Sequence, residues 1–221
     1  MKLKAYTQSD LDRYLSNDVI MQKLKSHASD SHFISHKWLL EMPAKRMICN
    51  DVYGPLFLEK GKRILDIGGG FSGLSREFIM GHDYTLVDIM AHDKHESIKN
   101  IENETKKFWA NSDWSEFKAE GKYDYVIAND LFPNVDQRLQ EFIEKFKPIG
   151  KKMIITLTAY DLARSYKVKR VDAEEILTIK PWTSEITAFI LSKTLNQQIE
   201  LLGDPASSPF PNKRLVYRLE L

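Results

Sequence analysis

The chain has 221 residues, of which 43% are hydrophobic and 29% are charged, and its formal net charge is +1. This composition excludes a disordered or fibrous chain, and the near balance of charge argues against a protein whose main task is to grip nucleic-acid phosphates. A single cysteine, Cys49, excludes an internal disulfide framework and favours a reducing compartment.

The length fits one domain over residues 1–221. The first residues, MKLKAYTQSDLDRYL, lack the apolar run of a signal peptide. No stretch approaches the roughly 18 apolar residues that a membrane helix requires. We therefore expect a cytoplasmic protein without a membrane partner.

Residues 1–60 are predicted to be helical and to form a lid or flank before the sheet, because their apolar residues recur at helical spacing. Four apolar, largely β-branched runs then predict strands at 63–67, 84–88, 123–128 and 153–158, with helices at 73–81, 94–108 and 136–146 between them. Such strands, spaced by helices, predict a doubly wound α/β fold with a mostly parallel sheet.

The C-terminal part begins with an excursion over 160–182, followed by a helix at 184–195 and strand-like runs at 198–202 and 214–219. The sequence GDPASSPFPNK between the two runs contains three prolines, so it cannot form a crossover helix. We therefore expect these last two strands to pair antiparallel.

The stretch RILDIGGGFSGLSREFI, residues 63–79, contains G-x-G-x-x-G at Gly68, Gly70 and Gly73, between a strand and a helix. Glycines there let the backbone turn tightly and approach a ligand. Asp88 follows at the end of the second strand, where a carboxylate accepts hydrogen bonds from ribose hydroxyls. These features fit both NAD and S-adenosylmethionine.

Three features favour S-adenosylmethionine. Asp66 stands where dinucleotide-binding turns usually have an apolar residue, and its carboxylate suits a ligand with a cationic amino-acid end. The pair Asp113 and Trp114 offers an acceptor for an adenine amino group beside an aromatic surface. The antiparallel closing strand is foreign to the usual dinucleotide-binding sheet.

The chain resembles the class I S-adenosylmethionine-dependent methyltransferases over residues 60–160. ILDIGGGFSG is similar to their first motif, LVDI to the second, SDW to the third and YDYVIANDLFPNVD to the fourth. The resemblance implies a seven-stranded Rossmann-like sheet with an antiparallel C-terminal strand. It also implies cofactor-binding residues: Asp66, Gly68, Gly70 and Gly73 on the methionine and ribose side, Asp88 at the ribose, Ile89, Asp113 and Trp114 around adenine, and Asn129 near the methionine. Gly69 departs from the family, which often has cysteine, alanine or serine there.

The loop at 129–136 follows the fourth motif and should face the methyl acceptor, with Asp130 and Asn134 as its polar candidates. It lacks the [DNS]-P-P-[YFW] pattern of enzymes that methylate nucleobase or amide nitrogens. His32 and His36 would share one helix face and are candidate bases; the alternative is an exposed polar face. No metal site is predicted.

Basic residues in the excursion suggest an anionic acceptor, although a solvated charged strand would look the same; they are Arg164, Lys167, Lys169 and Arg170. The sequence therefore predicts methyl transfer to a small polar acceptor, with a hydroxyl of a sugar-type or anionic metabolite favoured by analogy with polysaccharide and natural-product enzymes. A small-molecule N-methyltransferase, a non-catalytic binding module and an NAD oxidoreductase are the alternatives. The pattern leaves the oligomeric state open.

Overall fold

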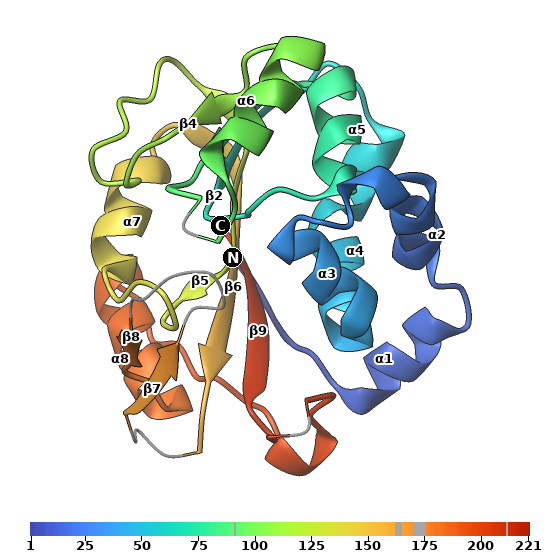
Figure 1. Cartoon of the computed structure of the whole chain (residues 1–221). Coiled ribbons are helices and arrows are strands. Elements are labelled where there is room, and N and C mark those ends of the chain that lie inside the picture. Colours follow the sequence, from blue (N-terminus) through green and yellow to red (C-terminus); the bar gives the residue numbers. More distant parts are fainter. Residues whose placement is uncertain (91, 162–164, 170–175, 211) are drawn as a thin grey trace.

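The computed structural model of the protein describes residues 1–90, 92–161, 165–169, 176–210 and 212–221. Within these residues, seven strands form one sheet in the order β1-β9-β6-β5-β2-β3-β4 (Figure 1). Strands β2, β3, β4, β5 and β6 run parallel, and β9 pairs antiparallel with β6 and with β1. The strands are β1 (Lys2–Ala5), β2 (Arg63–Ile67), β3 (Asp83–Val87), β4 (Trp109–Ala110), β5 (Tyr123–Phe132), β6 (Gly150–Ala159) and β9 (Leu215–Glu220).

Helices cover both faces of this sheet, and Figure 1 shows α1 to α5 on one side and α7 and α8 on the other. The helices are α1 (Gln8–Leu15), α2 (Val19–Ser26), α3 (Ile34–Glu41), α4 (Pro43–Leu58), α5 (Gly73–Gly81), α6 (His95–Glu104), α7 (Leu139–Phe146) and α8 (Ser184–Leu195), with short 3-10 turns at Ala28–Asp30 and Pro205–Ser207. Local signals begin several of them: Thr7 and Asp10 form a capping box before α1, and Asp18 and Thr183 cap α2 and α8.

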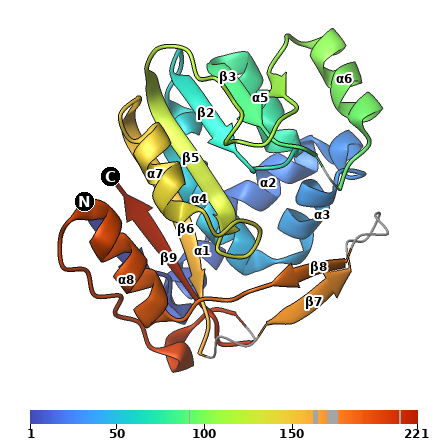
Figure 2. The same ribbon diagram turned by 90° about the vertical axis from the view of Figure 1, so that its left-hand side faces the viewer.

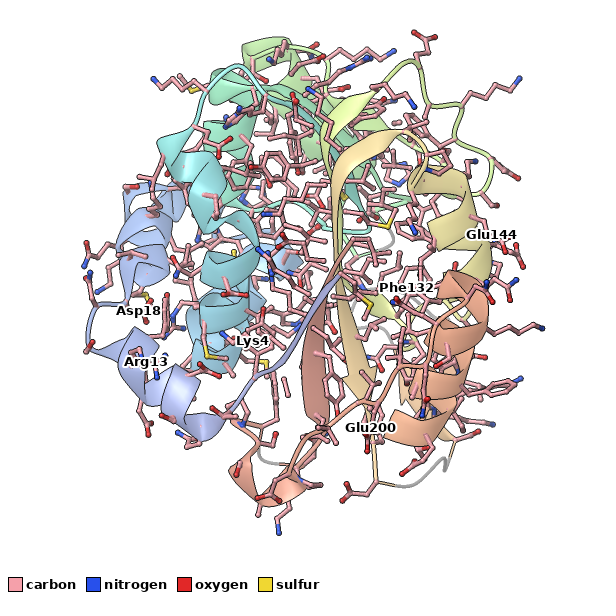
Figure 3. The ribbon with its side chains drawn as sticks, turned by 180° about the vertical axis from the view of Figure 1, so that it is seen from behind. Lys4, Arg13, Asp18, Phe132, Glu144 and Glu200 are labelled. Carbon is pink, nitrogen blue, oxygen red and sulfur yellow. The ribbon has the colours of Figure 1, made fainter. Side chains whose placement is uncertain are left out.

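Each face of the sheet has its own hydrophobic core. Residues of α1, α2, α4, α5 and α6 form one core with inward side chains of the sheet. Residues of α7 and α8 form the other with the opposite side chains, and Phe132 lies in this second layer against Phe142 (Figure 3). The doubly wound, mostly parallel fold with an antiparallel C-terminal strand is therefore confirmed.

The predicted strand at 198–202 is wrong, and so is its pairing with the last strand. Ile199 and Leu201 are buried, which produces a strand-like alternation in the sequence. The backbone of Ile199 instead bonds to the side chain of Ser192, its N–H donating to Oγ at 2.9 Å. These bonds tie the segment to α8 as an irregular connection.

The N-terminus supplies the missing strand, so the prediction of helix throughout residues 1–60 is also wrong. Strand β1 pairs with β9 in the register Leu3↔Leu219, and the Tyr6 N–H extends the pairing to the Val216 carbonyl at 2.9 Å. The predicted helix at 94–108 ends at Glu104, because Trp109 and Ala110 form β4 at the opposite sheet edge.

The excursion after β6 forms a separate antiparallel pair, β7 (Tyr166–Lys169) and β8 (Ile176–Ile179). Figure 2 shows this pair as a separate ribbon below the main sheet. Among the basic residues singled out in the sequence, Lys167 is exposed, whereas Arg164 and Arg170 lie outside the described residues.

The longest helix in the described part of the chain, α4, has 16 residues. None of the described helices has the length and apolar character needed to cross a bilayer.

The new edge strand makes a stability prediction. Tyr6 is 1% exposed, and its hydroxyl donates to Asp51 at 2.8 Å. Tyr6→Ala should lower the free energy of unfolding by about 3–5 kcal/mol, and Tyr6→Phe by about 1 kcal/mol, in urea titrations. Leu202→Ala, in the wrongly predicted strand, is the control and should cost less than about 0.5 kcal/mol, because Leu202 is 71% exposed. Equal costs for Tyr6→Ala and Leu202→Ala would contradict the role given to the N-terminal edge.

Candidate active site

A cavity of about 480 Å³ opens at the carboxyl ends of β2, β3 and β5 and is closed on its other side by α3 and α4. We call it the main cavity. Ten of the sequence-predicted site residues line it: Asp66, Gly68, Gly70, Asp88, Ile89, Asp113, Trp114, Asn129, Asp130 and Asn134. The fold thus brings together residues from four separate segments of the chain. Gly73, His32 and His36 are not among its lining residues.

The glycine turn has no space for side chains. Gly68 and Gly70 have φ values of 68° and 65°, a backbone region that residues other than glycine rarely adopt. A Cβ on Gly70 would lie 2.0 Å from the Ser35 hydroxyl oxygen of α3. Helix α3 therefore packs directly on the turn and forms part of the wall over it.

Gly69, the position that departs from the family pattern, is explained by Asp66. A Cβ on Gly69 would lie 2.7 Å from the Asp66 Oδ1 and 2.8 Å from its Oδ2. The carboxyl group of Asp66 thus occupies the space in which a cysteine, alanine or serine side chain would have to lie.

Asp66 is buried at the end of β2 and accepts hydrogen bonds from two tyrosines, Tyr53 at 3.0 Å and Tyr84 at 2.8 Å. Burial raises the pKa of Asp66 to about 7, with a smaller contribution from the nearby Asp88, although the tyrosine hydroxyls oppose the shift. The group is therefore poised to lose or gain a proton near neutral pH when a charged ligand binds beside it.

Asp88 connects the end of β3 to the glycine turn. Its Oδ2 accepts from the Gly70 N–H at 2.9 Å, and its Oδ1 accepts from the Met90 N–H at 2.7 Å. The adjacent Ile89 is 48% exposed in the cavity wall and offers an apolar surface. This places a carboxylate and an apolar side chain side by side in the cavity wall.

Asp113 and Trp114 lie together at the far wall, but Trp114 is 5% exposed and packs in the core against Phe142. Its indole N–H donates to Asp136 at 2.7 Å. Arg138 bridges the Asp113 and Asp136 carboxylates, at 3.0 Å from Asp113. The pair is therefore a rigid wall, with Asp113 as its more exposed polar member.

The two candidate histidines lie outside the cavity. His32 precedes α3, is exposed and bonds through Nδ1 to the Ser29 carbonyl, so the two histidines do not share a helix face. His36 is fully buried, and its Nδ1 accepts a hydrogen bond at 3.1 Å from the N–H of Gly73, which is the first residue of α5. Burial lowers the pKa of His36, which keeps the ring neutral and able to accept. His36 thus caps the helix that follows the glycine turn.

Asn129 and Asp130 end β5 at the mouth of the cavity. Thr156 of β6 donates to Asn129 at 2.9 Å and accepts from the Asp130 N–H at 2.8 Å. Asp130 has a φ of 63°, a costly conformation outside glycine that often marks functional positions. Burial alone would raise the pKa of Asp130. Lys45 lies 2.7 Å from the carboxylate, and its positive charge outweighs the effect of burial and holds the pKa of Asp130 below its usual value.

Sequence reasoning missed Lys45 and Arg214, and both line the main cavity. Lys45 lies in α4 and meets Asp130 across 85 positions of sequence. Arg214 directly precedes β9. No motif surrounds either cation. Only knowledge that β9 returns antiparallel beside β6 could have placed Arg214 at this edge.

No protein-family model matches the chain, and no curated protein sequence matches it significantly. Solved structures do match. DhpI, in complex with S-adenosylhomocysteine, is 15% identical with a TM-score of 0.52 over 90% of this chain and 95% of that chain. Coclaurine N-methyltransferase, bound to N-methylheliamine and S-adenosylhomocysteine, is 11% identical with a TM-score of 0.50 over 79% and 72%. A methyltransferase from Clostridium acetobutylicum is 14% identical with a TM-score of 0.49 over 79% and 89%. The chain has the fold of the S-adenosylmethionine-dependent methyltransferases.

The contact between Gly69 and Asp66 makes a prediction. Gly69→Ala should lower the free energy of unfolding by about 1–3 kcal/mol, because the added Cβ must displace a buried carboxyl group. Gly81→Ala is the control, since a Cβ at Gly81 meets nothing within 4 Å. Thermal unfolding of both variants measures the difference. A Gly69→Ala protein as stable as Gly81→Ala would show that the Asp66 carboxyl group does not occupy this space.

Proposed function

We propose that the protein is an S-adenosylmethionine-dependent methyltransferase that acts on a small polar acceptor, with the whole chain working as one unit. The observation that carries the proposal is the convergence of the glycine turn, Asp66, Asp88 and the 113–114 wall on one cavity of about 480 Å³. These residues suit the cofactor chemically, because their carboxylates would pair with its cationic amino group and accept hydrogen bonds from its ribose hydroxyls.

Each part of the cofactor has a proposed partner. Asp66, beneath the turn, would hold the cationic amino-acid end, with Asn129 nearby, and Asp88 would accept hydrogen bonds from the ribose hydroxyls. Ile89 would pack on the adenine and Asp113 would accept from its amino group beside Trp114. Gly68 and Gly70 would let the backbone approach, and Gly73 would act indirectly by starting α5.

The cofactor supplies an electrophilic methyl group on a sulfonium centre, so the chain must align the acceptor and remove its proton. The candidate bases His32 and His36 lie outside the cavity, whereas the polar candidate Asp130 lines it and is ionised. We assign it to orient an acceptor hydroxyl and to take up its proton as the methyl group transfers. Lys45 holds the carboxylate in place. Oxygen of a sugar-type or anionic metabolite remains the proposed methyl acceptor, on the analogy stated above.

The ribose assignment is tested by Asp88→Ala. Loss of charge-assisted hydrogen bonds should weaken binding of S-adenosylhomocysteine by about 1–3 kcal/mol in calorimetry. Because Asp88 also holds Gly70, Asp88→Asn serves as the second variant: it retains one acceptor oxygen and should lose less affinity. Unchanged affinity in Asp88→Ala would remove Asp88 from the proposed site.

The Asp66 assignment predicts a pH dependence. Its pKa of about 7 in the free protein means that the carboxyl group is protonated below neutrality and must lose its proton to pair with a cationic ligand. Affinity for S-adenosylhomocysteine should therefore fall as pH drops from 7 to 5.5, approaching about tenfold per pH unit.

Calorimetry at several pH values, in two buffers of different ionisation enthalpy, measures both the affinity and the proton released. Asp66→Asn should bind more weakly at pH 7.5 and show no such slope. If wild type and Asp66→Asn have the same pH dependence, Asp66 does not contact the cationic end.

A further inference from the structure

A second, smaller cavity of about 250 Å³ adjoins the main cavity, and we call it the side cavity. Five residues line both cavities, so the two are continuous: Trp38, Lys45, Asp130, Asn134 and Arg214. Tyr160 at the end of β6 and Ile179 at the end of β8 close the side cavity from the other direction. Its position next to Asp130 suits an acceptor whose reacting atom points into the main cavity.

Arg214 is exceptional among the arginines of the described part of the chain. Each of the others forms an ion pair with a carboxylate: Arg13, Arg46, Arg63, Arg76, Arg138 and Arg218. The Arg214 guanidinium makes no hydrogen bond or ion pair with a described residue, and its Nε is buried without a partner. A buried guanidinium donor without an acceptor is costly, which points to an acceptor that arrives with a ligand.

The position of Arg214 is fixed before any ligand binds. Antiparallel pairing of β9 with β6, in the register Ala159↔Leu215, brings the amino end of β9 to the carboxyl end of β6. The guanidinium lies over the Phe210 ring at 4.5 Å, and the Arg214 carbonyl accepts from the Ser208 hydroxyl at 2.6 Å. The donor fork is thus held in place by an aromatic face and by the backbone.

Among the described residues, the charged side chains that line the side cavity leave one positive charge in excess. Its charged lining residues are Lys45, Arg214 and Asp130, and Lys45 is already paired with Asp130 at 2.7 Å. A ligand with one negative charge would restore the balance. A carboxylate does this with a planar pair of oxygens that matches the guanidinium fork. A phosphate monoester, at nearly two negative charges, would leave an excess beside Asp130.

We propose that the side cavity binds the methyl acceptor by a carboxylate group on Arg214, with Trp38 providing an apolar wall for the rest of the molecule. The inference rests on the proposed function, since it names the acceptor class of that site. The volume of about 250 Å³ is below the usual range for drug-sized ligands, so the acceptor is a compact carboxylic acid.

The test compares a matched acid and amide on protein saturated with S-adenosylhomocysteine. Dissociation constants of 4-hydroxybenzoate, 4-hydroxybenzamide and phenyl phosphate are measured by ligand-observed NMR for wild type, Arg214→Gln and Arg63→Gln. Arg63 is the matched control, because its guanidinium also lies over an aromatic ring, Tyr123 at 4.7 Å, at the amino end of β2. Calorimetry with S-adenosylhomocysteine shows that each variant is folded.

In wild type and Arg63→Gln, the acid should bind about tenfold or more tightly than the amide. In Arg214→Gln the ratio of the amide dissociation constant to the acid dissociation constant should fall to about one. Three results would overturn the inference. Wild type could bind acid and amide equally, or show no saturable binding of the acid in the millimolar range. Alternatively, the preference for the acid could persist in Arg214→Gln. Tighter binding of phenyl phosphate than of the acid would overturn the carboxylate assignment. Failure of wild type to bind S-adenosylhomocysteine would instead count against the proposed function itself.

Discussion

The absence of space around the glycine turn constrains the rest of the site. Asp66 fills the volume under Gly69, Ser35 of α3 touches Gly70, and Asp88 accepts from the Gly70 N–H. Side chains from β2, from the end of β3 and from α3 therefore meet at two consecutive residues, Gly69 and Gly70. Because an added Cβ at either glycine would collide with one of these side chains, the turn packs closely against both the sheet and α3. The cavity is the volume that this arrangement leaves open.

His36 extends the same constraint to the helix after the turn. Its neutral ring caps α5 at Gly73, where a Cβ would lie 2.2 Å from the Cβ of His27. Besides lining the cavity, the N-terminal helices thus support the site through side-chain contacts with the backbone of the turn. This explains why His36 is buried near the turn but does not face the cavity. The hydrogen bond from the Gly73 N–H to His36 ties the start of α5 to α3.

The second determinant of the site is the direction of β9. Its antiparallel return brings the loop before it to the edge at which the parallel strands end, so Arg214 lies beside Asp130 and Lys45. The N-terminal strand β1 completes the sheet outside β9. The edge that carries the side cavity therefore depends on both ends of the chain, whereas the glycine turn and its carboxylates depend on β2, β3 and β5.

The sequence predicted correctly those features that depend on residues close together in the chain. The turn at Gly68 and Gly70, Asp88 at a strand end and helix α8 all follow from residues within one or two elements. The strand at 198–202 was misjudged because Ile199 and Leu201 alternate as in a strand, while the Ser192 side chain takes the backbone bonds of Ile199. Lys45 and Arg214 could not be found, since their proximity arises from pairings between distant segments. The fold was thus largely predictable, the convergence of the motif residues on the main cavity mostly so, and the lining of the side cavity hardly at all.

The central claim is that the main cavity binds S-adenosylmethionine and not a dinucleotide. Thermal unfolding with millimolar S-adenosylmethionine, compared with millimolar NAD, tests it most directly, since a ligand that binds the native state raises the unfolding temperature by an amount that grows with the logarithm of its concentration relative to its dissociation constant. We predict a clear rise with S-adenosylmethionine and none with NAD. Stabilisation by NAD alone, or by neither ligand, would contradict the account.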